Sequence, residues 1–317
     1  MQRPFFSTII PAYNREKLIG KAIDSAAGQE FDDQEIIVVD DGSTDGTLNL
    51  LATYGDRIKV LRQENCGPGA ARNLGIAHAR GVYVAFLDSD DLWFPWTLST
   101  YADTIVRCER PVMLAGALFY FSNENHLGDI RQDGFQCTVF DDYLTAAGKG
   151  VFVGSGQAVV QRDVLVRSGG FSTAPINAED HDLAIRLGAS GRFVQIHSPF
   201  LIAYRQHSSA STMDSFRTYR GVQYLLSQEK EGKYPGGSSR GLQRRSIIMR
   251  HARPVTLGLL KLGYCREAWE LYRSTFAWHV QEGRWRYLVA FPALVAVSHL
   301  RFLRSDPQSE TGCKRAG

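Results

Sequence analysis

Hydrophobic and polar positions follow a regular pattern over the first hundred residues. Short apolar or alternating runs, typical of strands, occupy residues 5–10, 35–40, 58–63 and 82–88. Segments with helical periodicity lie between them, at residues 15–29, 45–55 and 68–80. Because apolar strands that alternate with helices are typical of parallel α/β sheets, we predict such a sheet here.

The pattern is less regular from about residue 110 to residue 215. We predict a long strand at 111–122, its return at 128–132, a short helix at 140–148, a strand and a helix within 156–171, and an amphipathic helix at 177–191. Beyond about residue 216 the pattern is helical to the end of the sequence. We therefore divide the chain into a domain at 1–215, with halves 1–109 and 110–215, and a helical extension at 216–317.

Charge is distributed unevenly between these parts. The whole sequence has a formal net charge of +3, which gives no indication of a nucleic-acid partner. From Arg240 onward, fourteen Lys or Arg residues stand against five Asp or Glu, so the remainder of the chain is acidic overall. An acidic first part and a basic tail indicate different partners for the two.

The five cysteines are widely spaced and include no CxxC pair, which favours free thiols in a reducing compartment. The first residues, MQRPFFSTIIPAYN, lack the apolar segment and small-residue cleavage site of a signal peptide. No run reaches the ~18 apolar residues that a membrane span needs. We therefore expect a cytoplasmic protein.

Polar side chains follow three of the predicted strands. Asn14 comes after the first strand, Asp40 and Asp41 after the second, and the acidic segment 88–91 after the fourth. In sheets of this kind, ligands bind beyond the carboxyl ends of the strands, so we predict one site assembled from these ends. The first strand is not followed by the Gly-rich loop of dehydrogenases, P-loop NTPases or sugar nucleotidyltransferases, which weakens those interpretations.

The sequence DSDD at 88–91 places three carboxylates in four positions at the end of a buried strand. Like charges so close together are unfavourable unless a cation is present. Asp88 and Asp90 project to the same side of an extended segment, where their oxygens suit Mg²⁺ or Mn²⁺ that bridges to substrate phosphates. We expect Asp91 to cap a helix that starts near Phe94.

Other polar positions each allow a structural and a functional interpretation. Asp40 and Asp41 either cap a helix or accept hydrogen bonds from a nucleobase or ribose. Arg72 is solvated, faces a phosphate, or braces the aspartate cluster. Glu179 and Asp180 either stabilise the first turn of a helix or provide a general base.

Seven segments together resemble the inverting glycosyltransferases of family 2, which have the GT-A fold. They are STIIPAYN, VVDDGSTDGT, NCGPGAARNLGI, AFLDSDD, GGF at 169–171, EDHDLAIRL and YRQH. They occur in the family's order and cover about residues 5–210, so the tail lies outside the resemblance. The implied fold is a Rossmann-like parallel or mixed α/β sheet with helices on both faces, here followed by a helical C-terminal extension.

The resemblance implies roles for individual residues. The nucleotide-sugar donor would contact Pro11, Ala12, Tyr13, Asn14, Asp40, Asp41, Arg72, Asp88 and Ser89. Asp90 and Asp88 form the family's DxD motif and would hold Mn²⁺ or Mg²⁺, with His207 as a further ligand unless that histidine is structural. Asp180 falls at the position of the catalytic base, with Glu179 beside it.

The implied activity is metal-dependent transfer of a sugar, with inversion, from a nucleoside diphosphate sugar to a hydroxyl group. UDP-sugars are the typical donors, and the acceptor would be a growing glycan or a lipid-linked saccharide of the cell surface. Two alternatives stay open: a non-catalytic sugar-nucleotide-binding protein and a nucleotidyltransferase. The last of these would release pyrophosphate instead of a nucleoside diphosphate.

One segment of the basic tail, GRWRYLVAFPALVAVSHLRFLR at 283–304, has a separate interpretation. Its apolar part, Tyr287 to Leu300, is flanked by arginines and would measure ~21 Å as a helix, too short for a bilayer core of ~30 Å. Pro292 interrupts it. The segment either packs on the catalytic domain or lies at the cytoplasmic face of the inner membrane, with Trp285 and Tyr287 at headgroup level.

Overall fold

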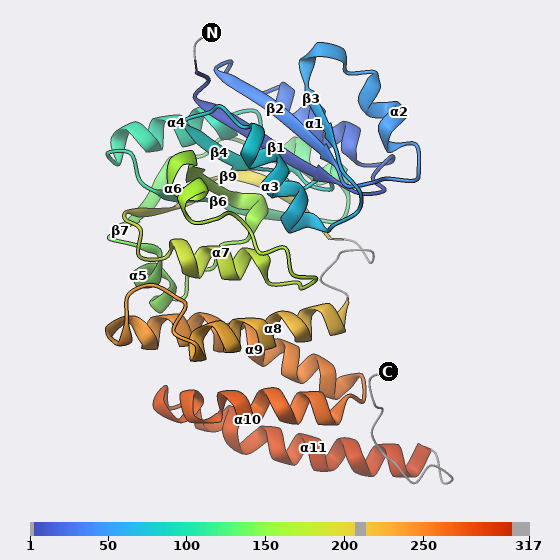
Figure 1. The fold of residues 1–317 in the computed structure, drawn as a ribbon, viewed down its shortest axis with the longest axis vertical. Coiled ribbons are helices and arrows are strands. Elements are labelled where there is room, and N and C mark those ends of the chain that lie inside the picture. Colours follow the sequence, from blue (N-terminus) through green and yellow to red (C-terminus); the bar gives the residue numbers. More distant parts are fainter. Residues whose placement is uncertain (1–2, 207–213, 306–317) are drawn as a thin grey trace. The chain divides into compact units, whose positions relative to one another are not determined.

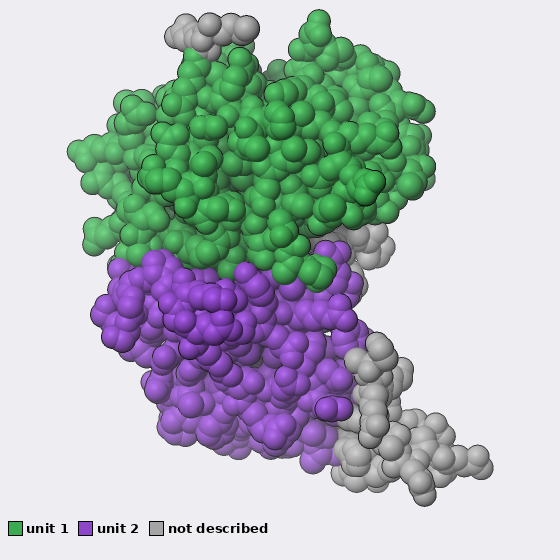
Figure 2. Space-filling model, viewed as in Figure 1, with its two compact units in different colours: residues 1–175, 179–210 green, residues 176–178, 211–317 purple. Residues whose placement is uncertain are grey.

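The computed structural model describes residues 3–206 and 214–305, which Figure 1 shows as a ribbon. The chain divides into two compact units (Figure 2). The first comprises residues 1–175 and 179–210, and the second comprises residues 176–178 and 211–317. The first unit is a mixed α/β structure and the second is helical.

One sheet forms the centre of the first unit, with nine strands among the described residues. These are β1 (Phe6–Ala12), β2 (Gln34–Asp40), β3 (Lys59–Arg62), β4 (Tyr83–Phe86), β5 (Leu92–Trp93), β6 (Met113–Phe121), β7 (Gln136–Phe140), β8 (Ala158–Gln161) and β9 (Phe193–Arg205). Their order is β3-β2-β1-β4-β8-β6-β9-β5, and β7 also pairs with β9. Neighbours among β1 to β4 are parallel, whereas β8 is antiparallel to both β4 and β6.

The strands β1, β2 and β4 are apolar and largely buried because helices cover both of their faces, whereas the edge strand β3 is largely exposed. On one face, α1 (Ile19–Ala27) and α4 (Thr97–Arg107) bury their apolar stripes in a core that includes Phe6 and Ile10. On the other, α3 (Pro68–His78) approaches β1 so closely that a Cβ at Gly75 would lie 2.6 Å from Cγ2 of Ile9. The predicted fold class, a mixed sheet between two layers of helices, is confirmed (Figure 1).

Shorter helices complete the first unit. They are α2 (Thr47–Ala52), α5 (Tyr143–Gly148), α6 (Arg162–Arg167) and α7 (Glu179–Leu187), with 3₁₀ turns η1 (Gly55–Arg57), η2 (Glu124–Asp129) and η3 (Ser155–Gln157). The predicted return strand at 128–132 is wrong, since η2 covers its start and none of the strands among the described residues covers the rest. Because β6 already lies between β8 and β9, the chain instead continues to β7, which pairs with β9.

The second unit consists of α8 (Ser215–Lys230), α9 (Gly241–Lys261), α10 (Cys265–Gln281) and α11 (Trp285–Ser305), with the 3₁₀ turn η5 (Ser238–Arg240). A buried ion pair, 2.7 Å between Nε of Arg244 and Oε2 of Glu229, joins α9 to α8. None of the helices within the described residues is long and apolar enough to cross a membrane.

The prediction that Pro292 interrupts the last apolar segment is wrong, because α11 continues through it. A proline removes the N–H that would donate to the carbonyl of Leu288, four residues earlier. Here the hydroxyl of Tyr272 on α10 donates to that carbonyl at 2.8 Å. The ring of Phe291 also stacks on Tyr272, with 4.5 Å between centroids. Tertiary contacts within the unit therefore replace the missing helical bond.

Candidate active site

The carboxyl ends of β1 and β2 are joined by hydrogen bonds between the loops that follow them. The N–H of Asn14 donates to Oγ of Ser43 at 2.9 Å, and Oδ1 of Asn14 accepts from the N–H of Thr44 at 2.8 Å. Asn14 adopts a left-handed conformation with φ of 52°, which asparagine tolerates better than most residues. The predicted donor residues Pro11 and Ala12 are buried in β1 just before this turn.

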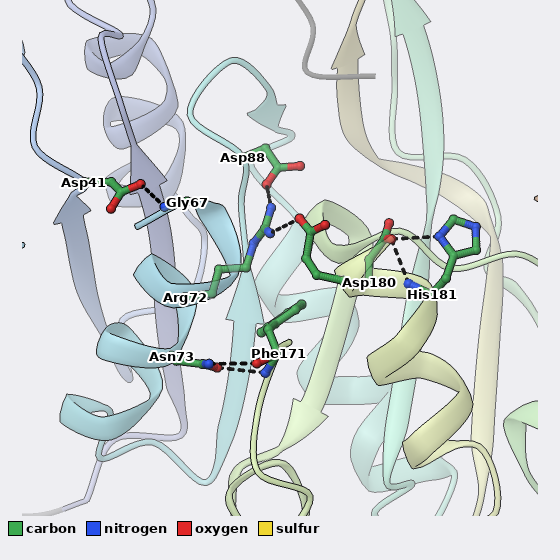
Figure 3. Close-up of polar contacts among 9 residues, drawn as sticks. Asp41, Gly67, Arg72, Asn73, Asp88, Phe171, Asp180 and His181 are labelled. Atoms are coloured by element: carbon green, nitrogen blue, oxygen red, sulfur yellow. Dashed lines mark hydrogen bonds and ion pairs between the residues drawn. The ribbon is translucent and has the colours of Figure 1, made fainter. Parts of the chain in front are cut away.

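Asp40 ends β2 and Asp41 follows it, and neither caps α2, which begins at Thr47. Asp41 is 3% exposed and accepts from the backbone N–H groups of Cys66 and Gly67 at 2.9 and 2.8 Å. Asp40 is fully buried, with its Oδ2 3.4 Å from Nε of Arg62. The helix-cap interpretation is therefore wrong, and Asp41 fixes the loop that leads into α3 (Figure 3).

An open cavity of about 500 Å³ adjoins this loop. It is lined by Gly42, Arg62, Gln63, Glu64 and Asn65. Gly42 lies just after β2, Arg62 ends β3, and the other three residues follow β3. The cavity therefore lies at the carboxyl edge of the parallel strands, where such sheets bind ligands.

Arg72 braces the acidic residues, and the solvated interpretation is wrong. Its Nη2 lies 2.7 Å from Oδ1 of Asp88 and its Nη1 lies 3.2 Å from Oε1 of Glu179 (Figure 3). The residue is 5% exposed, and its guanidinium lies over the ring of Phe171. Burial opposes the charged form, but the charges of Asp88 and Glu179 outweigh it and raise the pKa of Arg72. One cation thus links the end of β4 to the start of α7.

The three carboxylates after β4 have different surroundings. Oδ2 of Asp90 lies 3.6 Å from Nη2 of Arg15. Asp91 is buried and accepts from the N–H of Arg205 at 2.8 Å, so it holds the end of β9. The expected helix cap at Asp91 is wrong, since α4 begins only at Thr97. Burial, and then the charge of Asp88, raise the pKa of Asp91 to about 8.

Sequence reasoning missed two arginines at this edge of the sheet. Arg15 faces Asp90, and Nε of Arg205 donates to the carbonyl of Asp90 at 2.8 Å. Arg205 also pairs with Glu124, with 2.9 Å between Nη1 and Oε1. Arg15 follows β1 and Arg205 ends β9. A basic residue at the end of a strand near the acidic segment was the sequence signal that could have identified them.

Glu179 and Asp180, in the first turn of α7, differ in their hydrogen-bond partners and in their exposure to solvent. Glu179 is held by Arg72, and burial together with the charge of Asp180 raises the pKa of Glu179. Oδ1 of Asp180 accepts from the backbone N–H of His181 at 2.7 Å and lies 2.8 Å from the ring Nδ1 of the same residue. The side chain of Asp180 is 26% exposed against 13% for Glu179, so Asp180 is the more accessible acid.

Asn73, for which the sequence predicted no role, positions the loop that leads toward α7. Its amide donates to the carbonyl of Phe171 and accepts from the N–H of the same residue, at 2.9 and 2.8 Å (Figure 3). Gly170 has φ of 70°, and a Cβ there would clash with Oδ1 of Asn73. Asn73 of α3 therefore holds the GGF segment at 169–171 in place, and the same helix carries Arg72.

The acids after β4 are chemically suited to a divalent cation without forming a complete ligand set. Among the described residues, no group of three or more His, Cys, Asp or Glu side chains is arranged to hold a metal. Asp88 and Asp90 supply two carboxylates, and Mg²⁺ and Mn²⁺ commonly bind through one or two carboxylates with substrate phosphates and water. The predicted ligand His207 lies outside the described residues.

Comparison with solved structures identifies the fold. Residues 1–349 of TarS from S. aureus, in complex with UDP-GlcNAc, match with a TM-score of 0.68 over 86% of this chain and 80% of that chain. A mannosyltransferase from Pyrobaculum calidifontis, in complex with GDP-Man and Mn²⁺, matches with a TM-score of 0.50 over 94% and 88%. Both are 20% identical, so they show the fold alone, which is that of the GT-A glycosyltransferases.

Comparison of sequences identifies the family. The model of glycosyl transferase family 2 matches residues 7–167, and the chain belongs to this family. An uncharacterized glycosyltransferase of Rickettsia prowazekii, RP339, is 46% identical over 92 residues, 29% of each chain. Chondroitin synthase of Escherichia coli is 30% identical over 200 residues, 61% of this chain and 28% of the synthase. The chain thus matches less than a third of the length of these relatives.

Proposed function

We propose that the chain transfers a sugar, with inversion, from a nucleoside diphosphate sugar to a hydroxyl group of a saccharide or lipid-linked acceptor. The observation that carries this proposal is the link that Arg72 makes between Asp88, at the end of β4, and Glu179, at the start of α7. That link brings the acids suited to a metal and the acids suited to proton transfer into one site. UDP-sugars are the first candidate donors, an idea supported by the UDP-GlcNAc complex of TarS.

We assign donor binding to the half at 1–109 and acceptor binding to the half at 110–215. Tyr13 is 43% exposed beside the turn at Asn14, so its ring is accessible to a nucleobase. Asp41 holds the loop that leads into α3, and Asp40 is paired with Arg62, which lines the open cavity beside it. The direct contact of these two buried aspartates with a nucleobase or ribose stays a prediction.

Asp90 and Asp88 are the residues that we assign to Mn²⁺ or Mg²⁺, with His207 as a further candidate. The bound cation would neutralise charge on the diphosphate leaving group. Arg15, 3.6 Å from Asp90, contributes positive charge at the same place. The mannosyltransferase complex with GDP-Man and Mn²⁺ supports a divalent metal at this kind of site.

Asp180 is our choice for the general base, because its side chain is 26% exposed, whereas that of Glu179 is 13% exposed and is held by Arg72 at 3.2 Å. Its carboxylate would take the proton of the acceptor hydroxyl as that oxygen attacks the anomeric carbon. Glu179 stays bound to Arg72 and fixes the helix that carries the base. One displacement with no covalent intermediate gives inversion at the anomeric carbon.

The test is release of UDP from a panel of UDP-sugars with Mn²⁺, measured for wild type, Asp180→Asn and Glu179→Gln. Asp180→Asn keeps the shape of the side chain but cannot accept a proton, so turnover should fall by ~10²–10⁴ with donor binding little changed. Greater damage from Glu179→Gln would show that the wrong acid was chosen. Donor binding without release would indicate a binding protein, and pyrophosphate release a nucleotidyltransferase.

For α11 we propose contact with the cytoplasmic face of an anionic membrane, near a lipid-linked acceptor. The expected headgroup position of Tyr287 is wrong, because its ring packs against Tyr272 and His279 of α10. Leu288 and Phe291 are buried on the same helix, but Trp285 and Val289 are 60% and 73% exposed, and Leu294 and Val297 are also exposed. An apolar exposed face with arginines in the same segment is typical of interfacial helices.

Flotation with liposomes tests this contact. The full chain should float with anionic vesicles, and it should float less at high salt. The double substitution Trp285→Ser/Val289→Ser should lower recovery in the floating fraction, because it removes exposed apolar area without changing the packed side of the helix. Gln281→Ser is the matched control on an exposed position of α10. Equal recovery of all three proteins in the soluble fraction would exclude the contact.

A further inference from the structure

His181 lies against the carboxylate of the candidate base. Its ring Nδ1 is 2.8 Å from Oδ1 of Asp180, and its backbone N–H donates to the same oxygen at 2.7 Å (Figure 3). An ionised carboxylate can only accept hydrogen bonds, so Nδ1 must carry the proton in this contact. One oxygen of Asp180 therefore receives two donors from a single neighbouring residue.

The ring that makes this contact is itself held in place. His181 is 8% exposed, and its ring centroid lies 4.9 Å from that of Phe152. The same loop brings Gly154 toward the base, where an added Cβ would lie 3.8 Å from Oδ2 of Asp180. The imidazole is thus a packed group whose orientation limits the rotation of the carboxylate.

A purely structural histidine would need only this packing, which another aromatic ring could provide. The hydrogen bond adds a different property, since it stabilises the ionised form of the carboxylate and fixes its direction. Other charged groups near Asp180 are Glu179 on the same helix and Arg72 on α3, which interacts electrostatically with Asp180. His181 differs from both because its ring nitrogen bonds to the carboxylate directly.

We propose that His181 is a positioning residue that orients Asp180 and keeps it ionised for proton transfer. The inference rests on the proposed function, in which Asp180 is the base. A base must point at the proton that it takes, and a misplacement of about 1 Å can cost 10²-fold in rate. His181 acts through Asp180 and is not assigned any contact with substrate.

Three substitutions of His181 separate the effect of its hydrogen-bond donor from the effect of its ring packing. An asparagine side chain lacks the ring, but it is short and can place an amide N–H near the position of Nδ1, so His181→Asn should retain turnover within about threefold. His181→Gln moves the amide away from that position, and His181→Phe keeps a ring without a donor. Both should lower kcat for UDP release by roughly 10- to 100-fold while KM for the UDP-sugar changes little.

The pH dependence of kcat/KM provides a readout that packing alone would not move. The acid limb should shift to higher pH in His181→Gln and His181→Phe, because a carboxylate without the donor takes up a proton more readily, and it should stay in place in His181→Asn. If His181→Phe does not fold, as judged by its thermal melt, the comparison of His181→Asn with His181→Gln decides.

Each outcome supports or overturns the inference. Wild-type turnover and pH profile in His181→Gln and His181→Phe, or equal damage in all three variants, would exclude a positioning role. If Asp180→Asn also keeps full turnover, the base assignment itself fails. A severe loss in Asp180→Asn with unaffected His181 variants would overturn the positioning role alone.

Discussion

Replacing Arg72 with methionine should destabilise the first unit because it leaves two carboxylates without their shared cation. The guanidinium lies 2.7 Å from Oδ1 of Asp88 and 3.2 Å from Oε1 of Glu179, and its own side chain is only 6% exposed. Removal of one partner from a buried ion pair costs about 3–5 kcal/mol. The side chain of Asp88 is 28% exposed and can regain water, so we expect the lower end, about 3 kcal/mol.

A double-mutant cycle shows whether the pair causes the loss. Glu179→Gln alone should cost less than Arg72→Met, because the arginine still pairs with Asp88. Arg72→Met/Glu179→Gln removes one of the uncompensated charges, so its loss should be smaller than the sum of the single losses, by about 1–2 kcal/mol. The cycle therefore measures the coupling between α3 and α7.

Native-state hydrogen exchange of the β1 and β4 amides is the suitable assay, because the chain has two units and one global transition would mix them. Glu109→Gln is the control, since the Arg192–Glu109 pair is exposed and should change the free energy of opening by less than ~1 kcal/mol. If Arg72→Met also changes the free energy of opening by less than ~1 kcal/mol, or if the coupling energy is zero, the buried arginine does not stabilise the first unit through these two carboxylates.

Three further predictions concern other parts of the chain. Asp90→Ala should abolish UDP release. The midpoint of the thermal melt should stay unchanged or rise, since the substitution relieves repulsion with Asp88 and Asp91. Full activity of that variant, or of wild type in excess EDTA, would exclude the metal. Burial lowers the pKa of His279 from 6.5 to about 4, so the folded state favours the neutral ring. The free energy of opening of the second unit should therefore fall by up to about 3 kcal/mol as the pH drops from 6.5 to 4, and His279→Phe should flatten that slope in native-state hydrogen exchange of the α10 amides. Tyr272→Phe should cost about 1–3 kcal/mol in the same assay because it leaves the carbonyl of Leu288 without its donor, and an unchanged free energy of opening would contradict that account.

The sheet and the place of the site could be predicted because both follow from local patterns. Strands buried on both faces are apolar throughout, as β1 is, and their periodicity differs from that of the helices between them. The predicted meeting of three strand ends is borne out by the order β2-β1-β4, which places those strands side by side. Parallel neighbours carry their carboxyl ends to one edge, so Asn14, Asp41 and Asp88 lie at the same edge.

The partners of individual side chains could not be predicted, because they come from distant parts of the chain. Arg72 meets Glu179 across 107 positions, and no local pattern distinguishes that contact from a solvated arginine. The expected cap at Asp91 failed for the same reason, since its acceptor is used by Arg205, 114 positions away. The role of Asn73 in holding Phe171 was equally invisible in sequence.

The strand order has a consequence for synthesis of the chain. The parallel strands β3, β2, β1 and β4 are all present once residue 86 has emerged, but β8, which covers the other side of β4, begins at residue 158. At roughly 5–20 residues per second, β4 waits about 4–14 s for its partner. During that time its apolar residues Tyr83 to Phe86 form an open sheet edge, the feature from which aggregates start. The nascent chain is therefore most in need of a chaperone after the four parallel strands have formed, and a fragment that stops near residue 109 would keep that edge open permanently.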